Sequence, residues 1–351
     1  MASPDTASAD TARPGWSPAH QRVIDLLGRR PDDLPVGTEV VEALRAELDA
    51  RLAPAARRIP DHATLFVGKS TLHQLDTCEG RWQAEATSRF RWTVPAARGT
   101  VAHKAIELQA NWRGESEPCR LVDEAVARLA DDAGALGEFL RTLSTVELAE
   151  LRQEAVGFVT AFEECFPPLK SRWRPVVDGA SRVLLAGGRI VLGGRPDLTL
   201  GRATDGGKVI IDLKTGRPSR HHVDDLRFYA LVDACKVGLP ARRLATLYLD
   251  SATPVVEAVT PGVLEAATER VVRSVEAMVE VRTGHRPATV RANPMCRWCP
   301  ALPSCETGSA WVAAEADGEH DDPFWWPEVA VDALGEPEDG TDDLEDDDDP
   351  A

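Results

Sequence analysis

Two aspartates and a lysine have a spacing that suits metal-assisted hydrolysis, in the stretch GGRPDLTLGRATDGGKVIIDLKTGRP. Alternation along a strand places Asp212 and Lys214 on one face, with Leu213 turned away. The turn-forming residues between the two apolar runs predict a hairpin centred near residues 204–205. Such a hairpin brings Asp197 opposite or next to Asp212, with Cβ atoms about 5 Å apart.

Two carboxylates at that distance repel each other unless one is protonated or a cation joins them. Mg²⁺ takes its protein ligands from one or two carboxylates, and Lys214 supplies positive charge for a developing oxyanion. The pair therefore predicts a divalent-metal site. Repulsion also predicts that loss of Asp212 is neutral or slightly stabilising without metal. The alternative is a solvated hairpin with ordinary surface charges.

A histidine upstream is a candidate further ligand, in the segment ARGTVAHKAIELQ. His103 and Glu107 are four residues apart, so they share one face of the helix expected there. His103 is predicted to bind the metal, whereas a helical histidine can also be purely structural. Glu107 is a second candidate ligand on the same helix face.

Three cysteines are clustered near the C-terminus in PMCRWCPALPSC, where Cys296, Cys299 and Cys305 form a C-x2-C-x5-C pattern. Three thiols on a Pro-rich, non-periodic loop are hard to explain by core packing. Cys78 is the candidate fourth ligand, 218 residues before Cys296. The set predicts an iron–sulfur cluster of the 4Fe–4S type; zinc and unrelated buried thiols are the alternatives.

The stretch Gly68-Lys69-Ser70-Thr71 has the ending of a nucleotide-binding P-loop. A P-loop also needs a glycine five positions before its Gly-Lys, and Ala63 stands there. The stretch is therefore interpreted as the start of a helix with Ser70 or Thr71 as its N-cap.

The periodicity that must position these residues predicts an α/β fold. Strand-like patterns cover 181–216, 244–250 and 254–259. Helical patterns cover 18–28, 37–57, 99–113, 119–165, 219–236 and 261–282. The remaining cysteines, Cys119, Cys165 and Cys235, lie in such helical patterns and are expected to be small buried hydrophobes.

Composition limits the class of protein. The 351 residues are 43% apolar, which is enough for a substantial core. Seven cysteines at irregular spacing argue against a secreted disulfide framework. The sequence shows neither a signal peptide nor a transmembrane run, so a cytoplasmic protein without membrane contact is predicted. The net charge of −17 comes from the last 37 residues, which hold 17 acids and no Lys or Arg.

The order of motifs resembles the RecB-type branch of the PD-(D/E)XK nucleases: G-T-x-x-H, P-D, D-x-K-T-G, a helix with a tyrosine, then C-x2-C-x5-C. It is most similar to the iron–sulfur members, such as the CRISPR-associated exonucleases and AddB-type nuclease domains. The resemblance covers residues 65–310 and implies a restriction-endonuclease-like core, a mixed central sheet flanked by helices. The remaining expected parts are a helical segment 18–64, a helical insertion 119–165 and an iron–sulfur loop 294–306.

The resemblance also implies roles for individual residues. His103, Asp197 and Asp212 would bind Mg²⁺ or Mn²⁺ with the Leu213 carbonyl, and Lys214 would orient the attacking water. Tyr229 matches the tyrosine of the family's Q-x-x-x-Y, but Asp225 stands at the glutamine position. The candidate phosphate contacts are Arg217, Arg220, His221 and His222.

The activity implied is hydrolysis of DNA by an exonuclease acting on single strands or DNA ends, in repair, recombination or defence. The sequence contains no helicase domain, so unwinding would come from a partner in trans. The alternative is a non-catalytic, nuclease-like module that binds DNA or a partner and keeps a structural metal site.

The two ends of the chain have compositions typical of disorder, at residues 1–17 and in the acidic stretch 311–351. Within the latter, DDPFWWPEV places Phe324, Trp325 and Trp326 among acids. This segment is interpreted as a peptide that binds a protein partner, as a DNA mimic that lies over the cleft, or as a solubilising tail.

Overall fold

The computed structural model describes residues 16–316, apart from 31–32, 34–35, 89–90 and 113–116. The aromatic segment of the acidic tail and nearly all of the predicted disordered N-terminus lie outside the described residues. The described helices are α1 Pro18–Leu27, α2 Thr38–Ala56, α3 Lys69–Thr77, α4 Glu79–Glu85, α5 Val94–Ala110, α6 Pro118–Asp131, α7 Ala135–Thr142, α8 Thr145–Cys165, α9 Arg220–Val237, α10 Pro261–Arg282 and α11 Glu306–Ala316.

The described strands form two mixed sheets, which confirms the α/β class. One sheet has the order β1-β4-β3 and the other β2-β5-β6-β7-β8. Each contains one parallel pair, β1 with β4 and β6 with β7. The strands are β1 Leu65–Val67, β2 Val176–Val177, β3 Ser181–Leu185, β4 Ile190–Gly194, β5 Leu198–Leu200, β6 Val209–Lys214, β7 Arg243–Tyr248 and β8 Thr253–Ala258.

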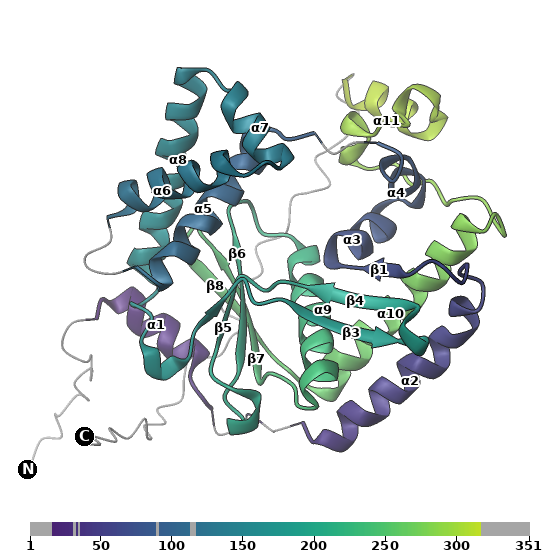
Figure 1. Ribbon diagram of the computed structural model, residues 1–351, viewed down its shortest axis with the longest axis horizontal. Helices are drawn as coiled ribbons and strands as arrows, with labels where there is room; N and C mark the ends of the chain where they lie inside the picture. Colours follow the sequence, from purple (N-terminus) through teal and green to yellow (C-terminus); the bar gives the residue numbers. More distant parts are fainter. Residues whose placement is uncertain (1–15, 31–32, 34–35, 89–90, 113–116, 317–351) are drawn as a thin grey trace, which may run out of the picture.

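The larger sheet separates two apolar cores, because its central strands bury side chains on both faces. Ile211 and Leu213 of β6 face the core shared with α5, α6 and α8. Ile210, on the opposite face of β6, belongs to the core shared with α2, α9 and α10. Figure 1 shows α5, α6, α7 and α8 together at the upper left, and α9, α10 and α2 together at the right. Asp212 points to the same side as Ile210, so α9 is the helix that meets it.

Most predicted helices are confirmed, with small shifts at their ends. The α5 helix begins at Val94 because Thr93 caps it, its hydroxyl accepting a hydrogen bond from the Ala96 N–H. The interpretation of Ser70 or Thr71 as an N-cap was wrong: Gly68 is the N-cap, and α3 starts at Lys69 directly after β1.

The expectation of three buried structural cysteines was right for Cys165 and Cys235 and wrong for Cys119, which is exposed. Cys119 lies in the first turn of α6, ahead of the buried face that begins at Leu121. None of the described helices combines the length and apolar content that crossing a bilayer requires.

The β5–β6 hairpin has the predicted register. Leu198 pairs with Ile211 and Thr199 with Ile210, which centres the hairpin between residues 204 and 205. Gly206 supplies the left-handed conformation that the connection needs, with φ of 65°. Continuing the same register by one residue sets Asp197 against Asp212.

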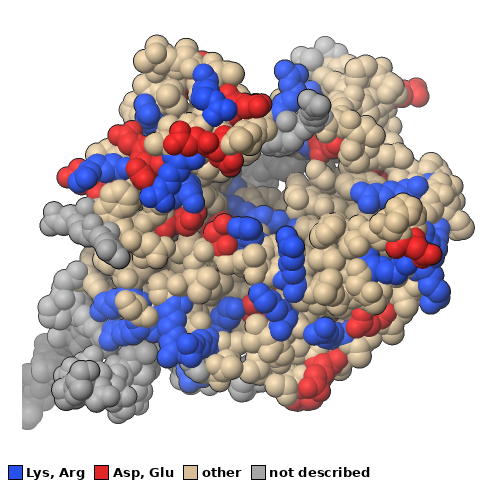
Figure 2. Space-filling view, in the orientation of Figure 1, with Lys and Arg blue, Asp and Glu red and all other residues tan. Residues whose placement is uncertain are grey.

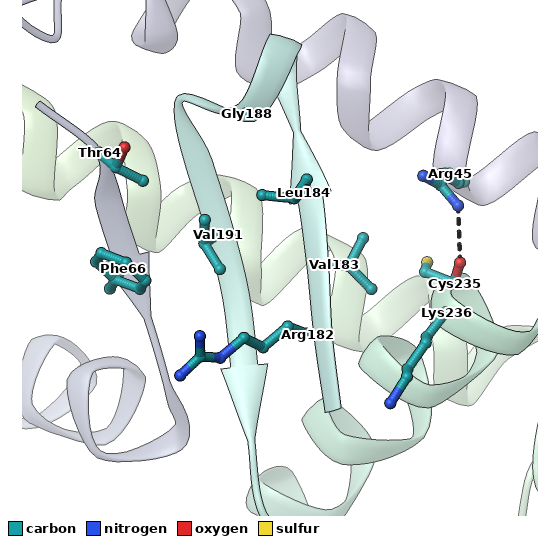
Figure 3. Close-up of a pocket in the computed structure, with 10 residues that line it drawn as sticks. All are labelled: Arg45, Thr64, Phe66, Arg182, Val183, Leu184, Gly188, Val191, Cys235 and Lys236. Atoms are coloured by element: carbon teal, nitrogen blue, oxygen red, sulfur yellow. Dashed lines mark hydrogen bonds between the residues drawn. The ribbon is translucent and has the colours of Figure 1, made fainter. Parts of the chain in front are cut away.

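The outer face of the smaller sheet carries an apolar row that spans all three strands. Phe66 of β1 and Leu184 of β3 both pair with Val191 of β4. Phe66 and Leu184 are each 63% exposed, whereas Val191 between them is buried. Figure 3 shows the row beside Arg45, Arg182 and Lys236, in a shallow pocket of about 590 Å³. Within the described residues no element covers this face.

Candidate active site

Asp212 lies at the centre of a charged cluster at the end of β6. Its side chain is fully buried, with no exposed surface. The Lys69 ammonium donates a hydrogen bond to Oδ1 at 3.1 Å, and Lys214 Nζ lies 2.5 Å from Oδ2. Each carboxylate oxygen therefore has a lysine within ion-pair distance, although in the described part of the chain only Oδ1 accepts a well-directed hydrogen bond. A buried aspartate requires this, because an unpaired charge in the interior is strongly destabilising.

Asp197 lies at the bend between β4 and β5, where the chain passes from the smaller sheet to the larger one. Its Oδ1 is 3.0 Å from Nδ1 of His103, which comes from α5. Its Oδ2 accepts a hydrogen bond from the Leu213 N–H at 2.6 Å. The structure thus brings together His103, Asp197 and the adjacent pair Asp212 and Leu213 from three parts of the sequence.

The charges of the cluster shift the pKa values of its members. Burial opposes ionisation of Asp212, but Lys69 and Lys214 hold its pKa below the ordinary value. Burial also disfavours protonated His103, yet the adjacent Asp197 carboxylate raises its pKa overall. Asp212 is therefore a carboxylate at neutral pH, and it carries the charge that a cation site needs.

Helix α9 adds Asp225 and Tyr229, one turn apart on the face that meets β6. Asp225 Oδ2 is 3.7 Å from Lys214 Nζ, and burial raises the pKa of this carboxyl. Burial likewise raises the pKa of Tyr229 to about 12, so its phenol is protonated. The Tyr229 ring fits against Gly194, where a Cβ would lie 2.2 Å from Cε1. Only glycine at 194 leaves room for that ring.

Lys69 is the residue of this cluster that sequence reasoning missed. Beyond its bond to Asp212, its ammonium lies 5.0 Å from the centre of the Tyr229 ring, a cation–π distance. Burial would lower its pKa, but Asp212 and the neighbouring acids hold the pKa above its ordinary value. The available signal was a cation in the first turn of a helix, where the helix dipole disfavours positive charge.

Several other candidates make contacts away from Asp212. Glu107 pairs with Lys104 on the same helix, with both carboxylate oxygens within 2.8 Å of Nζ. Arg217 and Arg220 are exposed beyond the end of β6. His221 and His222 lie in the first turn of α9, inside the helix predicted over 219–236.

Both of these histidines contact other side chains. The His221 ring meets the His73 ring edge-on, with centroids 4.3 Å apart. His222 Nδ1 lies 3.1 Å from the Tyr248 hydroxyl. Burial lowers the pKa of His222 to about 4, so the ring is neutral at neutral pH and does not carry the positive charge of a strong phosphate contact.

The cysteine-bearing segments meet at one corner, although they are far apart in the sequence. Cys78 lies between α3 and α4, and its Sγ accepts a hydrogen bond from the Arg291 N–H at 3.5 Å. A Cβ on Gly308 would lie 3.3 Å from the Cys305 sulfur and 3.5 Å from that of Cys296. Burial raises the pKa of Cys299, and the Cys78 and Cys296 thiols add to the shift. All four are free thiols.

Neither candidate centre is arranged as a finished ligand shell. Among the described residues, no three His, Cys, Asp or Glu side chains form a group that could hold a metal ion as they stand. The side-chain donors of the Asp197–Asp212 cluster nevertheless fit a hard divalent cation, since they are carboxylate oxygens with one imidazole. Asp225 Oδ1 is buried without a hydrogen-bond partner in the described part of the chain.

Comparison with known proteins agrees with this geometry. The site joins a mixed sheet, an aspartate at the entrance of β5, a second aspartate on the neighbouring strand β6 and a lysine two residues after the second. A family model described as the PD-(D/E)XK nuclease superfamily matches residues 69–306. The chain belongs to this superfamily, and its α/β core is of the restriction-endonuclease-like kind.

A solved structure titled "Crystal structure of SSO0001" is also similar, with 16% identity and a TM-score of 0.29. The similarity covers 59% of this chain and 95% of that one. No curated protein matches the chain.

Proposed function

We propose that this protein is a metal-dependent deoxyribonuclease that hydrolyses phosphodiester bonds at the Asp197–Asp212 site. The observation that carries the proposal is the pairing of these aspartates across the β5–β6 hairpin, with Lys214 2.5 Å from Asp212. Membership of the nuclease superfamily supports the class of reaction.

Asp197 and Asp212 would hold Mg²⁺ or Mn²⁺, together with the Leu213 carbonyl and His103. A divalent ion bound there neutralises charge on the phosphate and lowers the pKa of water. Lys214 keeps its ammonium on the reacting side of Asp212, where it can orient the attacking water. Tyr229 and Asp225 close the site from α9, and the protonated phenol can donate a hydrogen bond to a phosphate oxygen.

The proposed substrate is single-stranded DNA or a DNA end, cut as an exonuclease in repair, recombination or defence. Figure 2 shows the front face hollowed between the α5–α8 group and the side that carries α3, α4 and α11, with Lys and Arg side chains within reach of the hollow. Arg217 and Arg220, which are exposed after β6, are the proposed phosphate contacts of the DNA strand. A partner in trans would supply unwinding, and Phe324, Trp325 and Trp326 of the tail would bind a protein partner.

A structural 4Fe–4S cluster held by Cys78, Cys296, Cys299 and Cys305 is the second part of the proposal, with zinc as its alternative. Backbone N–H groups already point at three of these sulfurs, from Arg291 to Cys78, Asn293 to Cys296 and Gly308 to Cys305. Such hydrogen bonds to sulfur tune cluster potentials. The cluster would join the α3–α4 corner to the C-terminal segment.

The deciding experiment incubates anaerobically purified protein with end-labelled linear and circular DNA, single- or double-stranded, in Mg²⁺, Mn²⁺ or EDTA. We expect cleavage of linear DNA that requires a divalent metal and disappears in the isosteric variant Asp212→Asn. The matched control is Asp233→Asn, since Asp233 is also a buried aspartate paired with a lysine, Lys208, at the far end of β6. Cutting of circles would mean endonuclease action. Binding without any cleavage would favour the nuclease-like binding module.

A further inference from the structure

Lys69 occupies a position that helix formation does not favour. It is the first residue of α3, and its N-cap Gly68 makes no side-chain cap. The positive end of the helix dipole repels an ammonium there. The side chain nevertheless crosses to a carboxylate 143 residues further along the chain. A cation kept against local electrostatics indicates that its partner, not the helix, fixes its place.

The two lysines approach Asp212 from different environments. The Lys214 side chain is 16% exposed and belongs to the same strand as the aspartate. The Lys69 side chain is 32% exposed, although Asp212 itself is completely buried. Lys69 therefore lies on the solvent side of Oδ1, where an ion or a phosphate entering the site would meet it first. Its ammonium is also within cation–π distance of Tyr229.

We propose that Lys69 is a stand-in cation, which holds Oδ1 of Asp212 in the metal-free protein and is displaced when a divalent ion binds. This inference rests on the proposed metal site. Displacement follows because the ammonium and the ion compete for one carboxylate oxygen, and the two positive charges repel each other at that distance. Once released, the ammonium remains near Tyr229 and becomes a contact for a DNA phosphate, so Lys69 positions the substrate.

The alternative is that Lys69 is only a structural counter-ion of a buried acid, as Lys208 is for Asp233. A structural counter-ion contributes to folding equally with and without metal. A stand-in cation instead weakens metal binding, and its removal strengthens that binding. Close charge pairs are coupled by about 1.5 kcal/mol or more, and the change expected is therefore about tenfold or more in affinity.

The test measures Mn²⁺ affinity without DNA, by calorimetric titration and by the shift of thermal unfolding with Mn²⁺ concentration. We expect Lys69→Met to bind Mn²⁺ about tenfold more tightly than the wild type, whereas Lys69→Arg and the control Lys208→Met stay near the wild-type value. Equal affinities in Lys69→Met and wild type overturn the proposal and leave the nuclease function intact. Absence of Mn²⁺ binding in both proteins, by contrast, would refute the metal site together with the stand-in role.

Folding of the variant is informative in itself. If Lys69→Met folds only when Mn²⁺ is present, the ion has replaced the lysine, as proposed; if it folds in neither condition, Lys69 is a structural counter-ion and the proposal fails. A second arm measures affinity for a fluorescent single-stranded oligonucleotide in Ca²⁺ at low temperature, with a gel to verify that it is intact. Lys69→Met should lose about fivefold and Lys69→Arg should recover most of that loss. Unchanged DNA affinity would remove the phosphate-contact part of the proposal.

Discussion

Asp197 accepts a hydrogen bond from the Leu213 N–H at 2.6 Å, so a side chain at the entrance of β5 is bound to the main chain of β6. The other oxygen of Asp197 contacts His103 of α5. The Asp197 carboxylate therefore fixes the position of β6, which carries Asp212 and Lys214, relative to α5. The site is held by its own acidic residue, which makes its geometry sensitive to substitutions that leave the fold intact.

Loss of Asp212 should abolish cleavage and also destabilise the protein. The two lysines would lose their buried partner, so Asp212→Ala should lower the free energy of unfolding in metal-free buffer by about 3 kcal/mol. Urea denaturation measures this change. The control Asp233→Ala should cost a similar amount of stability but keep DNA cleavage. An Asp212→Ala protein as stable as the wild type would contradict this expectation and mean that both ammonium groups are solvated without the carboxylate.

That expectation reverses the sign derived from the sequence, where repulsion between the aspartates made removal of Asp212 neutral or stabilising. The hairpin itself was predictable, because strand alternation and the turn residues are local and set its register. The two lysine contacts are of different kinds. Lys214 is two residues from Asp212, but Lys69 is 143 residues away, and only the packing of α3 against α9 and α10 brings it close. Charge compensation across such distances is a tertiary property.

The same reasoning explains the other differences. Cys119 and Cys165 have similar helical surroundings in the sequence, yet only the packing of α6 decides which face is exposed. Asp225 stands at the glutamine position of the family motif, and only the fold shows that it is a buried acid beside Lys214. The short strand β1 before Gly68 was also missed, since three residues carry almost no periodic signal.

Gly194→Ala should damage the site without changing any charged residue. Its new methyl group would lie 2.2 Å from the Tyr229 ring, so the ring must shift from its present position. Overpacking of this kind costs about 1–3 kcal/mol. We expect cleavage to fall at least ~10-fold, since a misplacement of about 1 Å can cost far more. Gly157→Ala, where a Cβ meets nothing within 4 Å, is the control and should remain fully active.

Acid should weaken the corner that carries Cys78, through Glu79. Hydrogen bonds from Arg286, against the effect of burial, lower the pKa of Glu79 from 4.5 to about 2. Because the folded-state pKa is depressed, the stabilisation is complete above pH 4.5 and is lost as the pH falls toward 2. Unfolding free energies of wild type and Glu79→Gln, measured between pH 7 and 3, should therefore converge at low pH.

At neutral pH the Glu79→Gln change should cost about 3 kcal/mol, as for other buried pairs broken on one side. The exposed pair of Arg51 and Glu269 provides the comparison. Glu269→Gln should cost far less stability than Glu79→Gln, because solvent screens the exposed pair. A constant difference between wild type and Glu79→Gln at all pH values would show that the Glu79 charge is not what stabilises the corner.

Anaerobically purified protein should be brown, with absorbance near ~400 nm and about four irons per chain. Cys78→Ala should lose the iron and lower the melting temperature, because the cluster closes a very long loop between Cys78 and Cys296. Cys119→Ala is the matched control, since Cys119 is an exposed free thiol. Stoichiometric zinc without iron would replace the cluster by a zinc site. A Cys78→Ala protein that melts like the wild type would contradict the role of the cluster in joining the two segments.

Removal of residues 317–351 should strengthen DNA binding at low salt. The truncation keeps α11 and the ion pair of Arg297 with Glu315, yet it removes 16 acidic residues and no Lys or Arg. A tethered polyanion competes with DNA phosphates for the same basic surface at high effective concentration. The competition should fade above about 0.3 M salt, where the Debye length falls to several ångströms. DNA affinity of full-length and truncated protein at 0.05 M and 0.4 M salt measures the effect.

Replacing Phe324, Trp325 and Trp326 with alanine keeps all of the charge. Under self-competition this variant should bind DNA like the full-length protein, whereas a docking peptide predicts an unchanged DNA affinity after truncation and loss of a protein partner in the alanine variant.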